Sequence, residues 1–324
     1  MNKLRVGVIG TGNMGINHVR NYSEEIGYFD FIGVYDNDKE RSKKVAEKYR
    51  VNSFENMEEL LDAVDAVSVV VPSYLHKDIG IQVANHRVHA LIEKPLALNS
   101  IDAMEINEAF QENNVILQVG HIERFNPVIV ELEKLINREK IFFMEIHRYS
   151  PFSGSGRITD TSVVEDLMIH DVDIACHLLK SCEIEDIRAS GEIISSDKTD
   201  FASALLTFSN NVHVIINSSR VSQEKERSIT INSKNKNIYA DLLARSLSIT
   251  EGADLKSDID ENSTYRINGV VQKVFVPIKE PLKQELLAFY YNVMSRGKNN
   301  LVSGLDGIHA VEICEKIAGR IKNA

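Results

Sequence analysis

Residues 8–15 read Val-Ile-Gly-Thr-Gly-Asn-Met-Gly, so that Gly10, Gly12 and Gly15 form the pattern Gly-x-Gly-x-x-Gly. An apolar, strand-like run precedes these glycines and a helix-like pattern follows them. In this context the first glycine permits a tight turn, the second lets the backbone approach a pyrophosphate, and the third lets helix and strand pack closely. The helix N-terminus, at Asn13 and Met14, then offers free N–H groups to phosphate. The stretch therefore predicts a dinucleotide-binding turn between a strand and a helix.

An acidic residue completes this signature: Asp36 ends the apolar run Phe-Ile-Gly-Val-Tyr, 21 residues after Gly15. Its carboxylate can accept hydrogen bonds from an adenosine ribose and would repel a 2′-phosphate. We therefore expect NAD as the cofactor, with NADP less favoured but left open by the nearby Arg41 and Lys43. A glycine-rich turn that binds nothing is the alternative, and the agreement of strand, helix and acid argues against it.

The composition is that of a globular protein. The chain has 324 residues, of which 43% are hydrophobic, and its net charge is −10 with acids and bases intermixed. This length suggests about two domains, and the charge argues against a nucleic-acid or membrane partner. No apolar run is long enough to span a bilayer, and the first strand begins too early for a signal peptide. The three cysteines (Cys176, Cys182 and Cys314) are sparse and lack zinc-ribbon spacing, so we expect a protein of the reducing cytoplasm.

The first 120 residues alternate strand-like and helix-like patterns. The strand-like runs are residues 4–9, 29–35, 66–71, 89–93 and 115–119, and the helix-like stretches are residues 39–49, 57–61 and 101–111. Continuous Val/Ile runs separated by helices predict a parallel sheet covered on both faces. The expected fold of this part is an α/β Rossmann domain.

The pattern changes after Gly120. A helix (127–137), a strand (141–148) and a long helix (162–179) precede β-rich runs at residues 184–194, 202–208, 212–217, 228–232 and 270–276. Strands with few crossovers predict an α+β domain on a mostly antiparallel, open sheet. We place the domains at residues 1–122 and 123–303, with a C-terminal helix (304–324) packing back on the first. The polar residues 251–268 are expected to form a mobile connection.

Two segments at strand ends are candidates for the cofactor site. Glu93-Lys94-Pro95 follows the fifth strand, and ligands of open α/β sheets bind beyond the carboxyl ends of the strands. Lys94 would then face the cofactor, although a lysine in a surface loop has equal weight. A cis bond before Pro95 would orient the turn further. Pro72 and His76 follow the fourth strand and join the expected cofactor-binding set, with a structural proline and a helix-start histidine as the alternative roles.

A second group of ionisable residues lies on the long helix. Asp166, His170, Asp173 and His177 follow one another at steps of four, three and four, which places them on one helical face. Because buried charges are costly unless satisfied, a hydrogen-bonded internal network is the favoured interpretation for Asp173 and His177. A zinc site is the minor alternative, and we expect no metal.

Three arginines are candidates for gripping a negatively charged substrate, since the arginine fork suits phosphate: Arg124, Arg148 and Arg157. Arg124 lies in Gly-His-Ile-Glu-Arg-Phe-Asn-Pro (120–127), where it could instead clamp a hinge. Arg148 and Arg157 lie in and after a basic, aromatic run that could equally be an ordinary sheet edge and loop.

Together the glycine motif, Glu93-Lys94-Pro95, Arg124-Phe-Asn-Pro127 and Asp166-x-x-x-His170-x-x-Asp173 resemble the glucose–fructose oxidoreductase/inositol dehydrogenase/rhizopine-catabolism (Gfo/Idh/MocA) family along essentially the whole chain. The resemblance implies a Rossmann domain followed by an α+β domain whose open sheet often builds the oligomer interface, here of a homodimer or homotetramer. It also implies that Lys94, Asp166 and His170 are catalytic. Thr161-Ser162 stands where many relatives have glycine, which could reshape a substrate loop.

Within the family, residues 120–127 and 166–174 are similar to the UDP-N-acetylglucosamine 3-dehydrogenase branch. We expect oxidation of a secondary hydroxyl of a sugar or nucleotide sugar by hydride transfer to NAD, with C3 of UDP-N-acetylglucosamine as a candidate position. His170 would take the hydroxyl proton, Lys94 would stabilise the developing alkoxide, and Asp166 would orient a neighbouring hydroxyl or tune Lys94. The alternatives are an inositol or simple-sugar dehydrogenase and a non-catalytic NAD-sensing regulator.

Overall fold

The computed structural model describes residues 3–25, 27–136, 139–151, 161–181, 183–257, 265–299 and 301–322. The chain folds into two units, each with its own sheet. The first unit comprises Met1–Phe125 and Lys279–Glu315, and the second comprises Asn126–Ile278 and Lys316–Ala324. No helix of the described residues is both long enough and apolar enough to cross a membrane.

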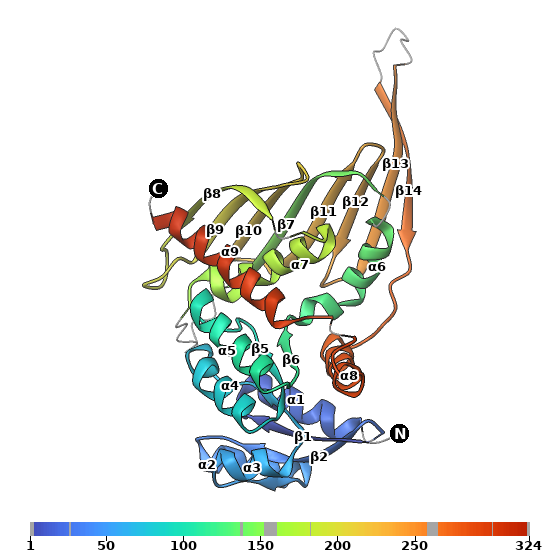
Figure 1. Cartoon of the computed structure of the whole chain (residues 1–324). Coiled ribbons are helices and arrows are strands. Elements are labelled where there is room, and N and C mark those ends of the chain that lie inside the picture. Colours follow the sequence, from blue (N-terminus) through green and yellow to red (C-terminus); the bar gives the residue numbers. More distant parts are fainter. Residues whose placement is uncertain are drawn as a thin grey trace. The chain divides into compact units, whose positions relative to one another are not determined.

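The first unit is built on a six-stranded sheet of order β3-β2-β1-β4-β5-β6, in which every pair of neighbours is parallel. The strands are β1 Leu4–Ile9, β2 Phe29–Tyr35, β3 Asn52–Ser53, β4 Ala66–Val69, β5 His89–Glu93 and β6 Leu117–Gly120. The helices between them are α1 Asn13–Glu24, α2 Lys39–Tyr49, α3 Met57–Ala63, α4 His76–Asn85 and α5 Ser100–Glu112 (Figure 1). The strand order reverses between β1 and β4, which is the switch point where dinucleotides bind. The predicted Rossmann domain is confirmed.

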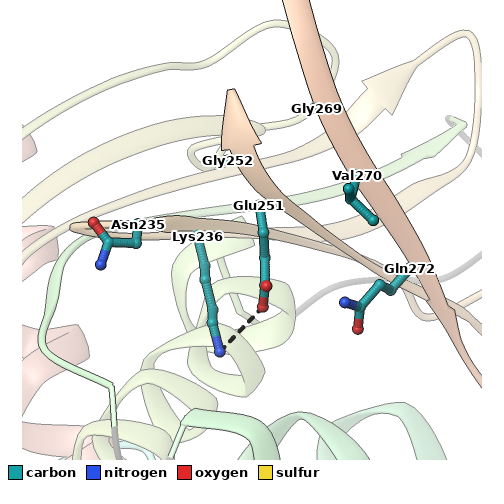
Figure 2. Close-up of a pocket in the computed structure, with 7 residues that line it drawn as sticks. All are labelled: Asn235, Lys236, Glu251, Gly252, Gly269, Val270 and Gln272. Carbon is teal, nitrogen blue, oxygen red and sulfur yellow. Dashed lines mark ion pairs between the residues drawn. The ribbon is translucent and has the colours of Figure 1, made fainter. Parts of the chain in front are cut away.

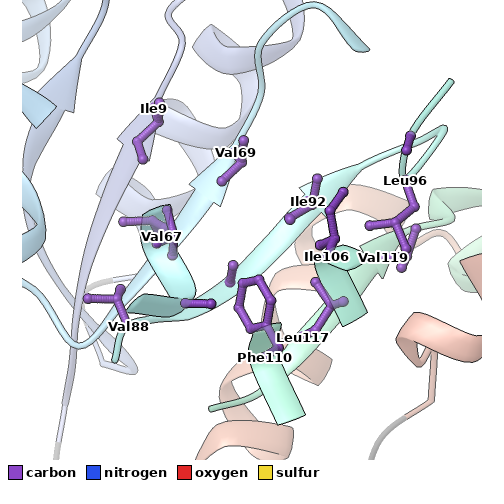
Figure 3. Packing of buried hydrophobic residues seen from close by; sticks show 14 of the residues in the cluster. Ile9, Val67, Val69, Val88, Ile92, Leu96, Ile106, Phe110, Leu117 and Val119 are labelled. Carbon is purple, nitrogen blue, oxygen red and sulfur yellow. The ribbon is translucent and has the colours of Figure 1, made fainter. Parts of the chain in front are cut away.

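Each face of this sheet has its own core, because successive side chains of a strand point to opposite faces. Figure 3 shows one core, in which Val67, Ile92 and Val119 of three neighbouring strands meet Ile106 and Phe110 of α5. The other core contains strand residues that point to the opposite face, such as Val6, Val8 and Leu91, together with Val19 and Tyr22 of α1. Strands buried on both faces explain the continuous apolar runs.

Residues 279–303 belong to the first unit, which differs from the predicted boundaries. Leu282, Leu286 and Phe289 of α8 (Pro281–Met294) are buried in the core that contains Val6 and Val8. Helix α8 thus helps to cover a parallel sheet to which it is not adjacent in the sequence. The last helix, α9 (Gly304–Lys322), begins in the first unit and ends in the second.

The second unit is built on an eight-stranded sheet of order β14-β13-β12-β11-β7-β10-β9-β8. Only the β7–β10 pair is parallel among the described strands, so the predicted, mostly antiparallel sheet is confirmed. The strands are β7 Ile141–Pro151, β8 Ile184–Glu192, β9 Phe201–Phe208, β10 His213–Ser222, β11 Glu226–Ser233, β12 Lys236–Asp241, β13 Ser246–Ser257 and β14 Tyr265–Val274. Helices α6 (Pro127–Ile136) and α7 (Ile169–Leu179) lie over one face (Figure 1).

The predicted mobile connection at residues 251–268 is wrong where the structure describes it. Residues 251–257 and 265–268 belong to β13 and β14, which pair antiparallel from Leu247↔Val274 to Ser257↔Tyr265. Residues 258–264 lie outside the described part. Because the backbone supplies the bonds of a β ladder, a polar sequence pairs as readily as an apolar one when a neighbouring strand is present.

Candidate active site

The glycine turn between β1 and α1 is shaped for close approach of a ligand. Gly10 has a φ of +93°, and a Cβ there would lie 2.3 Å from the carbonyl oxygen of Val70. A Cβ on Gly15 would lie 2.0 Å from the carbonyl oxygen of Gly10, whereas a Cβ on Gly12 would meet no atom within 4 Å. No side chain caps α1 at Gly12. The turn therefore offers open space and N–H groups at Asn13 and Met14, which fits a dinucleotide pyrophosphate.

Asp36 at the end of β2 is buried against this turn. Its Oδ2 accepts from the backbone N and Oγ1 of Thr11 at 2.6 and 2.7 Å, and its Oδ1 accepts from the Asp38 N and Arg41 Nη2 at 2.9 and 3.0 Å. Burial raises the pKa of the Asp36 carboxyl, but the bonds from Thr11, Arg41 and Asp38 outweigh burial and hold it below its ordinary value. Asp36 remains a carboxylate whose lone pairs are occupied, and Arg41 is its half-exposed partner, with 49% of the side chain accessible.

The segment after β5 is held by a buried histidine. The Lys94–Pro95 peptide bond is cis. His76, the first residue of α4, is fully buried, with Nδ1 2.8 Å from the Pro95 carbonyl oxygen and Nε2 3.0 Å from that of Val71. Burial lowers the pKa of His76. His76 therefore ties the ends of β4 and β5 together beside Pro72, a scaffolding role within the predicted cofactor-binding set.

The helix that carries Asp166 and His170 is not regular. Val164–Met168 form a π-helical segment before α7 begins at Ile169, a feature often found at functional sites. The single-face argument assumed 3.6 residues per turn, so it does not apply across Asp166. Within α7, Asp173 is buried, and His177 Nε2 lies 3.5 Å from Glu133 Oε2 of α6. The internal network expected for these two residues stays a prediction.

The start of this helix is fixed by three contacts that were not predicted. The Glu165 carboxylate accepts from the backbone N of Ser162 at 2.8 Å, and Ser162 Oγ accepts from Val164 N, as in a capping box. The carbonyl oxygen of Thr161 accepts from Arg220 Nη1 at 2.9 Å. Arg220 also donates from Nε to Asp200 Oδ1 at 2.7 Å. No sequence spacing connects Thr161 with β10, so only the fold reveals this contact.

Arg148 does not fit the predicted role in substrate binding. Its side chain is 1% exposed, and its Nε and Nη2 lie 2.8–3.0 Å from the carboxylate of Asp171 on α7. The strand alternation of β7 places Arg148 on the covered face, while its neighbours His147 and Tyr149 share the opposite face. Because this guanidinium is buried and paired with a carboxylate, it stabilises the interior of the second unit and is not accessible to a substrate.

The structure likewise favours the clamp interpretation of Arg124 over substrate binding. Its Nη2 donates to Asp306 Oδ1 at 2.9 Å and its Nη1 to the Leu301 carbonyl at 3.1 Å, so it joins the short helix Ile122–Phe125 to the start of α9. Arg157 lies outside the described residues.

A hollow elsewhere in the second unit was not predicted. It has a volume of about 720 Å³ and lies between the β11–β12 turn and the β13–β14 hairpin, lined in part by Asn235, Lys236, Glu251, Val270 and Gln272 (Figure 2). Lys236 Nζ lies 3.2 Å from Glu251 and 2.9 Å from Glu139, so its charge is balanced within the unit. Over the described residues no cluster of three or more His, Cys, Asp or Glu side chains is arranged to hold a metal ion.

Comparison with protein families and curated proteins matches both halves of the chain. Residues 4–121 match the model of an oxidoreductase family with an NAD-binding Rossmann fold, and residues 141–238 match the Gfo/Idh/MocA C-terminal domain. The chain is 35% identical over 250 residues to a UDP-N-acetylglucosamine 3-dehydrogenase of Acidithiobacillus ferrooxidans, covering 76% of each chain. It is 26% identical to a myo-inositol 2-dehydrogenase of Thermotoga maritima, over 94% of this chain and 92% of that one.

Among solved structures, a UDP-N-acetylglucosamine 3-dehydrogenase from Acidithiobacillus ferrooxidans superposes with a TM-score of 0.89 at 28% identity. The match covers 100% of this chain and 99% of the other. The relatives thus act on sugars or nucleotide sugars, and the cofactor of the matched Rossmann fold is NAD, as predicted. With the glycine turn, the strand order and both family matches in agreement, the chain belongs to the Gfo/Idh/MocA family of NAD-dependent oxidoreductases.

Proposed function

We propose that this enzyme oxidises the C3 hydroxyl of UDP-N-acetylglucosamine, with NAD as the hydride acceptor. The similarity to a dehydrogenase of that substrate carries the proposal, since it combines 35% sequence identity with a match over the full fold. The inositol dehydrogenases among the relatives support the same chemistry on a ring alcohol. Asp36 supports a preference for NAD over NADP, because a carboxylate at the end of β2 repels a 2′-phosphate.

The proposed catalytic set is Lys94, Asp166 and His170, the residues that the resemblance to the family implies. NAD, held by the glycine turn and Asp36, would supply the hydride acceptor for the alcohol carbon. His170 takes the hydroxyl proton as general base, and Lys94 donates a hydrogen bond to the same oxygen and stabilises its developing negative charge. Asp166 orients a neighbouring hydroxyl of the sugar. The glycine turn (Gly10, Gly12 and Gly15) binds the pyrophosphate.

The test is NADH formation by the wild type and by His170→Ala with UDP-N-acetylglucosamine, where loss of the base should lower kcat by about 10²–10⁴-fold. Binding of NADH, followed by its fluorescence, should persist. His213→Ala is the matched control, since His213 is an exposed histidine on β10 of the same unit and should leave kcat unchanged. Undiminished turnover in His170→Ala would refute the assigned base.

The second candidate function is oxidation of a free cyclitol or simple sugar. It is favoured by the myo-inositol 2-dehydrogenase relative, whose match extends over 94% of this chain. A panel of UDP-N-acetylhexosamines, inositols and free aldoses separates the two. Turnover on inositol or glucose, without turnover on UDP-N-acetylglucosamine, would support the proposed mechanism and refute the proposed substrate. Binding of NAD with no turnover on the whole panel would favour a regulator that senses NAD.

The assembly proposed is a homodimer or homotetramer formed through the open face of the eight-stranded sheet, in the cytoplasm. That face carries Glu145, His147 and Tyr149 on β7, with His147 Nε2 3.0 Å from Glu145 and Nδ1 2.7 Å from the Tyr149 hydroxyl. The mass in solution, measured by light scattering, tests the assembly. A monomer at micromolar concentration would contradict it.

A further inference from the structure

Four buried polar side chains form a line through the first unit beneath the end of β5. Tyr22 and His18 come from α1, Ser68 from β4 and Glu93 from β5, and their exposed fractions are 1%, 0%, 0% and 9%. The Tyr22 hydroxyl lies 2.8 Å from Ser68 Oγ, which lies 3.1 Å from His18 Nδ1. His18 Nε2 lies 3.0 Å from Glu93 Oε1. Buried polar atoms thus form a continuous chain that joins the phosphate-binding helix to the residue before Lys94.

The donors of this chain can all point toward Glu93. When His18 carries its proton on Nε2, the Tyr22 hydroxyl donates to Ser68, Ser68 donates to His18 Nδ1, and His18 donates to the Glu93 carboxylate. Burial raises the pKa of the Glu93 carboxyl, but the hydrogen bond from His18 and the nearby charges outweigh it and lower the pKa below its ordinary value. Glu93 is therefore a buried carboxylate that depends on His18 as its side-chain donor.

The other oxygen of Glu93 contacts the backbone of the proposed catalytic lysine. Lys94 N donates to Glu93 Oε2 at 3.3 Å. On the neighbouring strand, a Cβ added to Gly120 would lie 3.1 Å from the same Oε2, so β6 leaves only enough room for the carboxylate. His76 holds the carbonyl oxygen of Pro95 on the far side of Lys94. The backbone of Lys94 is thereby restrained by one buried histidine before it and another after it.

We propose that His18 is a positioning residue for Lys94: by holding the Glu93 carboxylate in place, it fixes the backbone from which the lysine side chain reaches the reacting oxygen. The proposal rests on the proposed function of Lys94. Its physical basis is that a misplacement of about 1 Å, even when caused by a change away from the chemistry, can cost about 10²-fold in rate. Helix α1 begins at the glycine turn, so the same helix binds the phosphates and supports the lysine.

Two substitutions at His18 separate the contact with Glu93 from the contact with Ser68. A glutamine amide can reach the position of Nε2 and donate to Glu93, whereas an asparagine amide replaces Nδ1 and is too short to reach the carboxylate. We expect His18→Asn to lower kcat by about 10–100-fold and His18→Gln to restore most of it, with similar dissociation constants for NADH. Equal kcat values in the two variants would overturn the proposal.

His89→Asn is the matched control. His89 lies at the opposite end of β5, partly buried, where Nδ1 accepts from Ile116 N at 2.9 Å. This variant should lower the melting temperature and leave kcat unchanged. Gly120→Ala is a second way to disturb Glu93 without touching His18, and it should lower kcat in the same way as His18→Asn. A loss of kcat in His89→Asn as large as in His18→Asn would show that general loosening of β5 is the cause.

A double-mutant cycle decides whether His18 acts through Lys94. If it does, His18→Asn should lower kcat in the wild type but not in the Lys94→Ala background, with NADH binding measured in all four proteins. A further loss of the same size in that background would overturn the positioning role and leave the proposed function standing. Full activity of Lys94→Ala alone would instead refute the proposed role of the lysine, so the two failures are distinguishable.

Discussion

Two buried acid–base pairs, one in each unit, hold the segments that precede the proposed catalytic residues, and they do so differently. In the first unit, Glu93 Oε1 contacts His18 Nε2, and Glu93 Oε2 accepts from the backbone N–H of Lys94. In the second unit, Asp200 receives Arg220 on one oxygen and three backbone N–H groups, from residues 194–196, on the other at 2.6–3.0 Å. Arg220 in turn holds the carbonyl oxygen of Thr161.

The difference indicates what each pair stabilises. The Asp200–Arg220 pair organises a turn and the segment before the helix that carries the proposed catalytic residues, so its loss removes many contacts at once and should mainly destabilise the second unit. The His18–Glu93 pair ends on one peptide group, and its loss should mainly move Lys94. We therefore expect loss of the Asp200–Arg220 pair to lower mainly the free energy of unfolding. Loss of the His18–Glu93 pair should lower mainly kcat.

The largest expected effect on stability is that of Arg220→Ala. Removing one partner of a buried ion pair leaves an uncompensated charge and costs about 3–5 kcal/mol, to be measured by urea unfolding. Arg188→Ala is the matched control, since Arg188 pairs with Asp186 at 3.0 Å while 79% exposed, and an exposed pair contributes about 0–1 kcal/mol. If the two variants unfold at the same urea concentration, the comparison between the units fails.

The same pair predicts a pH dependence. Burial raises the pKa of the Asp200 carboxyl, but the bonds from Ser195, Arg220, Ile194 and Ser196 hold it far below its ordinary value. A lowered folded-state pKa stabilises the fold above the unfolded value of about 3.9 and loses this contribution as the pH falls below it. The difference in unfolding free energy between the wild type and Asp200→Asn should therefore be constant near neutral pH and narrow below about pH 4. A difference that widens on acidification would contradict this assignment.

A smaller effect on stability is expected in the first unit. His18→Asn removes a donor from a buried carboxylate, which costs about 1–3 kcal/mol, less than Arg220→Ala. The order of kcat should be the reverse, with His18→Asn the slower enzyme at a temperature where both are folded. Measuring both quantities on both variants sharpens the comparison, and the same order in both would show that each pair is simply structural.

The smallest expected effect is on cofactor preference. Arg41 occupies one lone pair of Asp36 and is half exposed, so Arg41→Ala should weaken NADPH binding by about 0.5–1 kcal/mol, as expected of a partly exposed charge. NADH binding should be unchanged or tighter, because Asp36 is freed for the ribose. Lys43→Ala is the control, since Lys43 lies 3.5 Å from Glu55 and is 58% exposed. Fluorescence titration with each cofactor measures both affinities. If Arg41→Ala binds NADPH more tightly than NADH, the prediction is contradicted.

Most predictions that depend on local spacing agree with the structure, and the exception is the common helical face expected for Asp166 and His170, which the π-helical segment Val164–Met168 interrupts. The glycines at 10, 12 and 15, the runs that became β1, β2 and β5, and the helix at residues 39–49 lie where the sequence pattern indicates. Each of these elements carries its own signal within a few residues, either a backbone position that excludes a side chain or an apolar run of strand length. The Rossmann fold and the family were predictable for this reason.

The partners of charged side chains were not predictable. Arg148 and Arg124 were expected to bind a negatively charged substrate because a guanidinium suits phosphate. Instead they bind Asp171 and Asp306, which are 23 and 182 residues away. The polar residues of β13 and β14 were interpreted as a connection, because backbone hydrogen bonds hold this pair of strands and their side chains give no strand pattern. In both cases the deciding atoms lie on another element, so no window of sequence contains the signal.

The sequence by itself determined the dinucleotide turn, the parallel sheet and the family, because these depend on residues close together in the chain. Only the tertiary structure decided that α8 covers the first sheet, that Asp36 is already bound by Thr11 and Arg41, and that a line from Tyr22 to Glu93 supports Lys94. A hydrogen bond or a buried contact depends on distances of a few ångströms between groups far apart in the chain, and folding alone brings those groups together.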